Sequence, residues 1–431
     1  MLHDEPLAAT ADALRRDRTD ITEYLKKLEK RTAVVEPKIK SLVGESNRWG
    51  RIHEEATTLA NNHSNAADRP PLYGIPIGVK DIFHVDGMPT LAGSELPAEV
   101  LTGDEGPVVN VLHDAGALIF GKTVTTEFAH FEPGPTRNPH DVERTPGGSS
   151  SGSAAAVAAG ICPAALGSQT IGSVIRPAAF CGIVGFKPSF DRISTDGVIP
   201  VSKSVDHVGF FTQDTAGASL MASILCKNWR QLPSPTGRPT LGVADGPYLK
   251  QASDTAIEAF ESQLEHLETC GYDLIKLTPF KDIEAINERH NRLVAADAAL
   301  AHYDWYSEYG DLYAEETKKL IESGKETAVE NVADYRRSRH EIRSRLSESM
   351  DNNGIDLWIS PAAPGPAPKG IDTTGDPVMN LPWTHTGFPT ITVPAGQTEA
   401  NLPMGVQLAG RFGADEDVIQ WSHKIANTLS K

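Results

Sequence analysis

Apolar positions in the first sixty residues of the chain recur near the spacing of a helix. The side chains that set this period are Leu7, Leu14, Ile21, Leu25 and Leu28. Polar residues fill most of the positions between them, so one face is apolar. The pattern predicts an N-terminal helical arm over residues 1–65 that packs on the main body of the protein.

Beyond the arm, short apolar runs alternate with helical patterns and glycine-rich turns. The patterns predict strands at 73–80, 117–120, 183–186, 272–277, 356–360, 391–394 and 404–408, and helices at 108–115, 154–160, 256–268, 334–348 and 417–429. This alternation predicts an α/β fold with helices packed around a central twisted sheet, mixed and largely parallel. We expect residues 66–431 to form one domain with a mostly helical insertion at about 250–350.

Composition places the chain among globular proteins with a sizeable core. Hydrophobic residues make up 39% and charged residues 23%, and the net charge is −17. Such acidity disfavours direct binding to nucleic acid or to an anionic membrane. The four cysteines form no C-x-x-C pair, and neither a leader peptide nor a run of about 18 apolar residues is evident. We expect a cytoplasmic protein with reduced thiols that binds neither nucleic acid nor membrane.

A run of glycine and serine is the most unusual stretch of the chain: it reads GGSSSGS over residues 147–153. Its position directly before an apolar helix disfavours a flexible linker. Part of it, Gly148 to Gly152, also fits the G-x-S-x-G elbow that would make Ser150 the nucleophile of an α/β-hydrolase. That elbow requires a strand just before it, and residues 138–146 do not have the pattern of one.

A second segment, residues 167–177, contains a tight turn that carries Ser173. Successive backbone N–H groups in such a turn can point at one atom. The N–H groups of Thr170, Ile171, Gly172 and Ser173 would form an oxyanion hole if Ser173 attacked a carbonyl. Taken alone, this pattern is weakly specific.

Lys80 ends an apolar strand and is the candidate base. Its amine can accept a proton only when neutral, so its pKa must fall from about 10.4 to about 7, which corresponds to about 4 kcal/mol. Burial of the side chain can lower the pKa by this amount. Strand alternation also directs Asp81 away from the face of Lys80. The alternative is a lysine whose amine reaches solvent. No metal is expected, because the nearest zinc-like pattern, HEEAT at residues 53–57, lacks the second histidine of H-E-x-x-H.

Together these segments resemble the amidase-signature family. Residues 74–81 are similar to the lysine motif of that family, residues 147–160 to its Gly/Ser signature, and residues 173–182 to its nucleophile segment. Residues 185–188 and 389–396 also match. The resemblance is strong over about 70–215 and moderate over about 354–425, and it is weak in the helical region between.

The resemblance implies an amidase-signature fold, with helices on both faces of the sheet, and an amide hydrolase that works through an acyl-enzyme without a cofactor. It implies a catalytic triad in which Ser173 is the nucleophile, Ser149 is the bridging serine behind a cis Gly148–Ser149 peptide, and Lys80 is the terminal base. It also suggests a substrate pocket that includes Thr126, Glu127, Phe128, Trp383 and His385, with ordinary packing as an equal alternative for each.

The turn departs from the common family pattern at three positions. Ile171 stands where glycine is usual and Gln169 where aspartate is usual, and Arg176 is displaced by one residue. Ile171 narrows the space above the turn. The side-chain support of the turn is therefore not assigned by the resemblance.

Three functions stay open at this point. The first is a stand-alone amidase that releases ammonia or an amine from a small or aryl carboxamide. The second is a glutamine-hydrolysing component of a multi-subunit enzyme, similar to the A subunit of glutamyl-tRNA(Gln) amidotransferase. The third is an inactive scaffold, which the intact Lys80, Ser149 and Ser173 disfavour. The expected partners are a small-molecule amide and either a second copy of the chain or a small accessory subunit.

Overall fold

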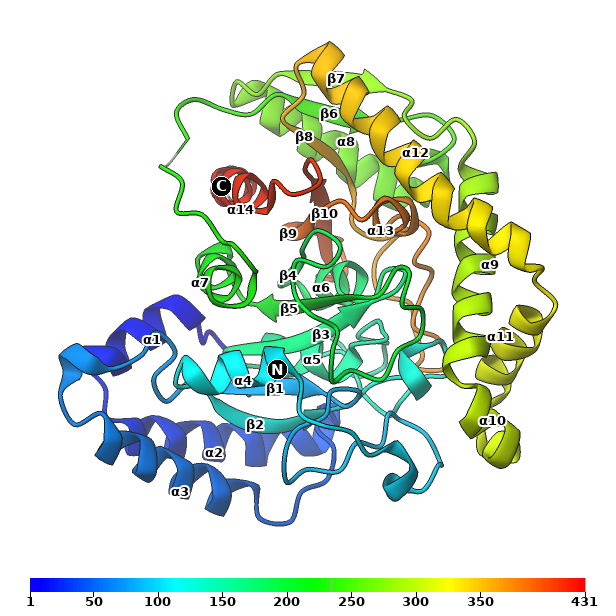
Figure 1. The fold of residues 1–431 in the computed structure, drawn as a ribbon. Coiled ribbons are helices and arrows are strands. Elements are labelled where there is room, and N and C mark those ends of the chain that lie inside the picture. The colour runs from blue at the N-terminus through cyan, green and yellow to red at the C-terminus, as the bar shows by residue number, and fades with distance from the viewer. Residues whose placement is uncertain (234, 431) are drawn as a thin grey trace.

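A computed structural model describes residues 1–233 and 235–430, and its centre is one ten-stranded sheet (Figure 1). The strands follow the spatial order β2-β1-β3-β5-β4-β9-β10-β8-β6-β7. Their bounds are β1 (Pro76–Lys80), β2 (Leu118–Thr123), β3 (Ala164–Gln169), β4 (Val184–Lys187), β5 (His207–Thr212), β6 (Leu241–Ala244), β7 (Leu274–Leu277), β8 (Leu357–Pro361), β9 (Thr390–Gln397) and β10 (Pro403–Ala409).

The sheet is mixed, with parallel pairs near its two ends. β1 is parallel to β2 and β3, and β6 is parallel to β7 and β8. The pairs between β3 and β8 are antiparallel. The predicted mixed sheet is confirmed, but its centre is antiparallel rather than largely parallel. One reason is that a short loop joins β9 to β10, and short loops connect antiparallel neighbours, whereas parallel strands need a long crossover.

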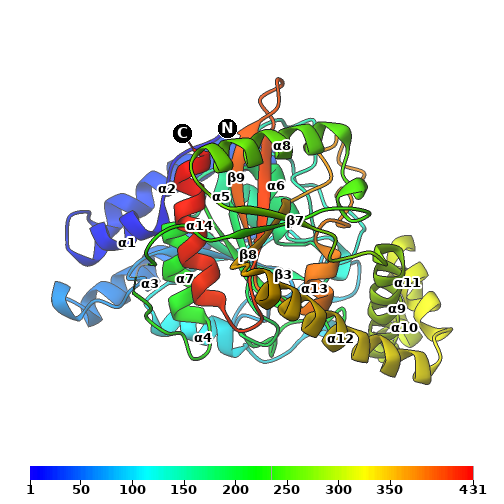
Figure 2. The same cartoon turned by 90° about the horizontal axis from the view of Figure 1, so that it is seen from above.

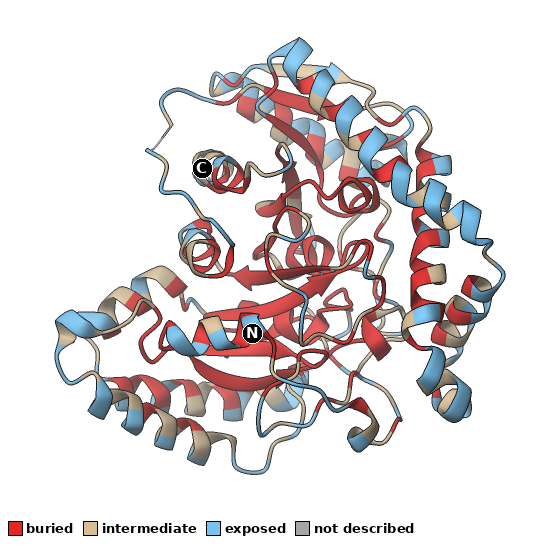
Figure 3. Cartoon of the chain, in the orientation of Figure 1, coloured by how far each residue is buried: buried red, intermediate tan, exposed pale blue. Residues whose placement is uncertain are grey.

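Helices flank this sheet, with their exposed faces outward and their buried faces toward the strands (Figure 3). Their bounds are α1 (Leu7–Arg15), α2 (Ile21–Ile39), α3 (Arg48–Asn62), α4 (Pro107–Asp114), α5 (Ser151–Ala158), α6 (Ile175–Cys181), α7 (Thr215–Leu225), α8 (Asp254–Thr269), α9 (Ile283–Ala301), α10 (Tyr303–Tyr309), α11 (Glu315–Lys325), α12 (Val329–Asn353), α13 (Leu381–Thr386) and α14 (Asp415–Leu429). Among the described residues, no helix combines the length and apolar character that a bilayer crossing requires.

The N-terminal helices α1 to α3 share one hydrophobic core with the sheet. Leu7, Leu25 and Ile52 are buried in the same cluster as Ile77 of β1. The residues that set the predicted helical period are therefore the ones whose side chains pack against the main body. The division at residue 65 stays a prediction.

The region predicted as a helical insertion contains two different parts. β6, α8 and β7 continue the main layer, because β6 and β7 are the last two strands at one end of the sheet. Helices α9 to α11 and the start of α12 form a lobe beside it (Figure 2). α9 packs against α11 and α12 and also against α13, which lies later in the chain, so the lobe reaches the segments that surround the site described next.

Three strands, β3, β5 and β6, were not isolated by the pattern analysis. Every residue of β3 (AALGSQ) is buried. A strand buried on both faces shows no alternation, and small residues give it little strand propensity. β3, which the sequence pattern did not identify, leads directly into the turn that carries Ser173.

Candidate active site

Lys80 ends β1, and its amine lies inside the protein on two serine hydroxyls. Its Nζ is 2.7 Å from Ser149 Oγ and 2.8 Å from Ser168 Oγ, and the side chain is 0% exposed. Burial lowers the pKa of Lys80 well below its ordinary value, and the carboxylate of Asp206 opposes this in part. The buried amine therefore favours its neutral form, which can donate to one serine and accept from the other.

Asp81, the next residue, makes its ion pair elsewhere. Its carboxylate binds Lys122 Nζ at 3.2 Å, on the neighbouring strand β2. Lys80 forms no salt bridge in the part of the chain that the structure describes. The strand alternation that predicted this separation is confirmed, so the charge of Asp81 is neutralised by another lysine.

The glycine–serine run before α5 is an ordered segment and not a linker. Gly148–Ser149 is a cis peptide, as the resemblance implied. The guanidinium of Arg176 in α6 donates to Gly148 O at 2.8 Å. At Gly147 φ is +85°, and a Cβ there would lie 2.8 Å from Pro177 Cα, so this position requires glycine. The segment of Ser149 is thus packed directly on the helix that follows Ser173.

Ser150, the alternative nucleophile, has a structural role. Its hydroxyl is fully buried and lies 3.2 Å from both the backbone O and the backbone N of Ser168. No strand occurs within residues 138–149. The strand required by the elbow is missing and the hydroxyl is already bonded, so the α/β-hydrolase interpretation is wrong.

The turn that follows β3 presents four backbone N–H groups in succession. Among the described residues, the N–H groups of Thr170, Ile171, Gly172 and Ser173 have no hydrogen-bond acceptor. The carbonyl of Gly172 accepts from Arg176 N at 3.0 Å, in the first turn of α6. Donors left free beside a candidate nucleophile are what an oxyanion hole requires.

Gln169 supplies the support for this turn that the sequence left unassigned. Its Oε1 accepts from Val174 N at 2.8 Å and from Ile175 N at 3.0 Å. Its Nε2 donates to Thr384 Oγ1 at 2.9 Å, and that hydroxyl donates to Ile171 O. A carboxylate could accept the same backbone bonds but could not donate to Thr384. The amide of Gln169 therefore ties the turn to α13.

Ser173 lies just before α6, at the wall of a small cavity. The side chain is 7% exposed, and the cavity measures about 10 Å³. Its lining includes the turn, Arg176, His130 and Phe131. No hydrogen bond joins Ser149 Oγ to Ser173 Oγ within the described residues. The structure thus brings Lys80 to Ser149, and it places Ser173 on the adjoining helix start with its hydroxyl free.

This small cavity adjoins a wider groove under the helical lobe. The groove measures about 580 Å³. Both spaces are lined by His130, Phe131, Ile171, Val294 and Pro377. The walls of the groove also include apolar residues of α9, α11 and α13, and charged residues lie among them: Glu288, Arg292, Glu316, Lys319 and Asp376. Ile171, where glycine is usual, therefore forms part of the passage between Ser173 and the groove.

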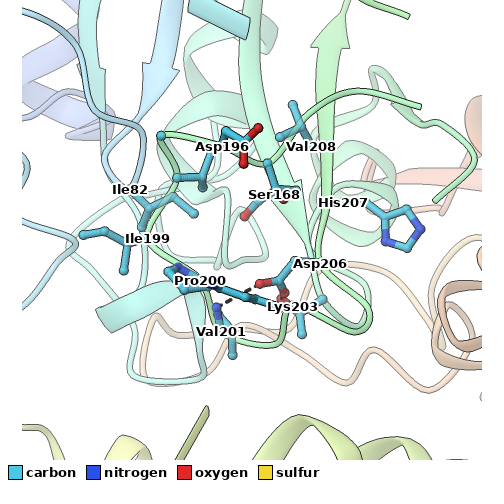
Figure 4. A pocket seen from close by; sticks show the side chains of 14 residues that line it. Ile82, Ser168, Asp196, Ile199, Pro200, Val201, Lys203, Asp206, His207 and Val208 are labelled. Atoms are coloured by element: carbon cyan, nitrogen blue, oxygen red, sulfur yellow. Dashed lines mark hydrogen bonds between the residues drawn. The ribbon is translucent and has the colours of Figure 1, made fainter. Parts of the chain in front are cut away.

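A separate cavity of about 280 Å³ adjoins the turn beside β3 and β5 (Figure 4). Ser168, Thr170 and Asp206 contribute to its lining. The Asp206 carboxylate accepts from Thr170 Oγ1 at 2.6 Å and from the backbone N of Val201 and Ser202 at 2.9 Å each. Burial raises the pKa of Asp206 to about 6. The Asp206 carboxylate therefore contacts the start of the turn and also raises the pKa of Lys80.

Three of the predicted pocket residues, Thr126, Glu127 and Phe128, pack away from the cavity at Ser173. The Glu127 carboxylate accepts from Ala314 N at 3.0 Å, just before α11. Phe128 stacks on Tyr313 with ring centroids 5.0 Å apart. The cavity is lined instead by the residues that follow them, 129–131. Glu127 and Phe128 therefore fix the loop to the lobe, whereas the Thr126 hydroxyl donates to His130 O within the loop.

The other two predicted pocket residues, Trp383 and His385, are fully buried in α13. Trp383 Nε1 donates to the hydroxyl of Tyr248 at 2.9 Å. His385 lies between Ser338 of α12 and His290 of α9. Neither residue lines the cavities that adjoin Ser173. Between them, Thr384 contacts the turn.

Sequence reasoning missed Ser168, Asp206 and Thr384, which contact Lys80 or the turn. Ser168 and Asp206 belong to the strongly similar region, but neither stands in a pattern that marks its role. Thr384 lies in a segment flagged for the pocket, and its contact with Ile171 spans 213 positions of sequence. No periodicity or spacing in one sequence reports such a contact.

Comparison with known proteins gives consistent matches over nearly the whole chain. The family model described as Amidase matches residues 23–419. The A subunit of a glutamyl-tRNA(Gln) amidotransferase from Koribacter versatilis is 29% identical over 457 aligned positions, covering 93% of this chain and 95% of that protein. A crystal structure of an amidase superposes with a TM-score of 0.89 at 29% identity, covering 99% of this chain and all of that one. A structure from work on an s-triazine catabolic enzyme gives a TM-score of 0.88 at 25% identity, covering 98% of both chains.

Proposed function

The chain belongs to the amidase family and is a hydrolase of amide C–N bonds, and we propose that it cleaves small carboxamides through an acyl-enzyme formed on Ser173. The observation that carries the proposal is the 2.7 Å contact between the buried Lys80 Nζ and Ser149 Oγ. A lysine buried on hydroxyls, with no carboxylate in contact within the described residues, is suited to accept a proton. The proposed reaction needs no cofactor.

In the first half of the reaction, neutral Lys80 accepts the proton of Ser149, and Ser149 accepts the proton of Ser173. Ser173 Oγ then forms a bond to the amide carbon. The carbonyl oxygen becomes an oxyanion and accepts from the free N–H groups of residues 170–173. This relay requires Ser149 Oγ and Ser173 Oγ to reach hydrogen-bonding distance when substrate is bound. Such contacts are often longer in the free enzyme.

In the second half, the C–N bond breaks and the leaving nitrogen takes its proton from Ser149. Lys80 returns a proton to Ser149, so the amine or ammonia leaves neutral. A water molecule then attacks the acyl-enzyme and gives one proton to the same relay. The carboxylic acid is released, and Ser173 regains its hydroxyl proton.

The dimensions of the site support a small substrate whose bulk lies in the groove. A cavity of about 10 Å³ holds about one water molecule, so only the reacting end can lie beside Ser173. The remainder must extend past Ile171 and Phe131 into the 580 Å³ groove. Apolar side chains such as Val294 and Leu381 line that groove, and they fit an alkyl or aryl acyl group.

The test is turnover of a panel of alkyl and aryl carboxamides, with ureas and carbamates alongside, measured as release of ammonia or amine. We expect the purified chain to hydrolyse members of the panel. Ser173→Ala should lower kcat by at least about 10⁴-fold, because the acyl-enzyme cannot form. Its urea unfolding midpoint should stay close to that of the unmodified protein. Turnover retained by Ser173→Ala in a folded protein would refute the proposal.

A second candidate is a glutamine-hydrolysing component that passes ammonia to a partner enzyme. The 29% identity to the A subunit of a glutamyl-tRNA(Gln) amidotransferase, over 95% of that protein, favours it. Glutamine hydrolysis that appears only with a second polypeptide would support this candidate. Turnover of an aryl carboxamide by the chain alone, as a monomer or a homodimer, would support the first. We further propose a cytoplasmic location, which the four unpaired cysteines fit.

A further inference from the structure

Two buried histidines connect the helical lobe to the oxyanion turn. His290 of α9 places Nε2 at 3.0 Å from Thr170 O and Nδ1 at 3.2 Å from His385 Nδ1. His385 of α13 places Nε2 at 2.9 Å from Ser338 Oγ of α12. Both histidine side chains are 0% exposed. Burial lowers the pKa of His290 to about 3 and that of His385 to about 2, so both rings are neutral at neutral pH.

The acceptors fix the direction of this chain of hydrogen bonds. A carbonyl can only accept, so His290 Nε2 carries the proton and donates to Thr170 O. A neutral imidazole has one N–H, so His290 Nδ1 must accept and His385 Nδ1 must donate. His385 Nε2 then accepts from the hydroxyl of Ser338. That hydroxyl also lies 2.8 Å from Tyr335 O, which competes for its single proton.

The bond at Thr170 O determines where a catalytic donor points. Thr170 C=O and Ile171 N–H belong to one planar trans peptide, in which the two groups point in opposite directions. A donor on the carbonyl therefore orients the N–H. The next two peptide units are fixed in the same way, by Thr384 Oγ1 on Ile171 O at 2.6 Å and by Arg176 N on Gly172 O at 3.0 Å. His290 thus completes a set of three donors, each behind one N–H of the turn.

We propose that His290 is a positioning residue for catalysis, which orients the Ile171 N–H toward the oxyanion in the tautomer that Thr170 O sets and that the bond from His385 supports. The inference rests on the proposed function of Ser173. It makes the helical lobe part of the catalytic apparatus, although this lobe carries no residue of the triad. It also gives His385 a role behind the turn rather than in the pocket.

The test uses an alkyl fluorophosphonate, because its reaction with a serine does not depend on knowing the natural substrate. Ser173 Oγ forms a bond to phosphorus and its proton passes to Ser149, the P–F bond breaks and fluoride leaves, and the phosphoryl oxygen occupies the oxyanion site. The rate of labelling separates into kinact, which reports the reacting geometry, and KI, which reports prior binding. Peptide mass analysis identifies the labelled serine.

Two amide variants discriminate between a positioning role and simple packing. Gln carries an amide nitrogen at the reach of His Nε2, whereas the nitrogen of Asn reaches only as far as Nδ1. We expect His290→Gln to keep kinact within about 3-fold, and His290→Asn and His290→Phe to lower it by about 10- to 100-fold with KI nearly unchanged. The loss should be smaller than that of a deleted oxyanion donor, which costs about 10²–10³.

A matched control exists at the C-terminal end of the same helix. His302 is 2% exposed, and its Nε2 lies 3.2 Å from the carbonyl of Pro200, outside the turn. His302→Phe should leave kinact within about 2-fold, even where urea unfolding shows a stability loss like that of His290→Phe. Equal kinact in His290→Gln and His290→Asn, or an equal loss in His302→Phe, would overturn the inference. Failure of the unmodified chain to be labelled at Ser173 would instead refute the proposed function.

Discussion

Two strands of the sheet end in a fully buried lysine, and the two amines have different hydrogen-bond partners. Lys80 ends β1 and Lys187 ends β4, and both side chains are 0% exposed. Burial lowers both pKa values, that of Lys187 to about 7 and that of Lys80 well below its ordinary value. Lys187 Nζ donates to the carbonyls of Phe388 and Pro188 at 2.6 Å and 3.1 Å. Lys80 Nζ instead lies on two hydroxyls.

The difference shows that a lowered pKa does not by itself make a base. A carbonyl has no proton to give, so a neutral Lys187 has nothing to deprotonate in its own contacts. The hydroxyl of Ser149 has a proton, and its segment packs on the helix that follows Ser173. Both lysines stand in motifs of the family resemblance. In the proposed mechanism, the partner of the amine, and not its burial, distinguishes a lysine that can act as a base from one that only stabilises the fold.

Within the comparison of the two lysines and their surroundings, the largest expected effect comes from removing each amine in turn. Lys80→Met should lower kcat by about 10³-fold, since a general base contributes about 10²–10⁴. Lys187→Met should leave kcat within about 3-fold, but it should lower the free energy of unfolding by about 1–3 kcal/mol because buried carbonyls lose their donor. Steady-state kinetics and urea unfolding measure the two effects. Equal kinetic losses in both variants would remove the distinction.

A smaller contrast is expected between two adjacent serines. Ser149→Ala should lower kcat by about 10²–10³-fold, because the proton path from Ser173 to Lys80 is interrupted. Ser150→Ala should change kcat by less than about 5-fold and should destabilise the fold by about 1 kcal/mol, through loss of its bonds to the Ser168 backbone. Paired kinetic and unfolding measurements would test this. A greater kinetic loss at Ser150 would restore the elbow interpretation.

The smallest expected effect is a displacement of the pH profile. The reaction needs neutral Lys80, so kcat/KM should fall as the pH drops through its pKa. The Asp206 carboxylate raises that pKa, so Asp206→Asn should move the acidic limb to lower pH. Burial raises the pKa of Asp206 to about 6, so its carboxylate is charged above that pH. The pH profiles of the unmodified protein and of Asp206→Asn should therefore differ most above that pH. An acidic limb that moves to higher pH in Asp206→Asn would contradict this prediction. Lys187→Met serves as the control and should leave the limb in place.

Sequence patterns predicted most elements of the fold, and the exceptions have a physical cause. The helices of the arm were found because each buries one face and so shows a period. Strands such as β1 and β2 were found as short apolar runs, although every residue in them is buried. β3 was not found because its sequence, AALGSQ, consists mostly of small residues with little strand propensity. The antiparallel centre of the sheet was not predicted either, since pairing direction depends on how strands far apart in sequence meet.

The sequence by itself determined the residue types of the candidate site: a lysine at a strand end, a serine in a glycine-rich run, and a turn that ends in a serine. Each of these features is a local pattern, because it depends on residue types within a few positions of one another. Only the tertiary structure decided what orients them. The donors on Thr170 O and Ile171 O come from residues 120 and 213 positions away. Such contacts arise when helices pack on the sheet, and packing leaves no spacing that one sequence can reveal.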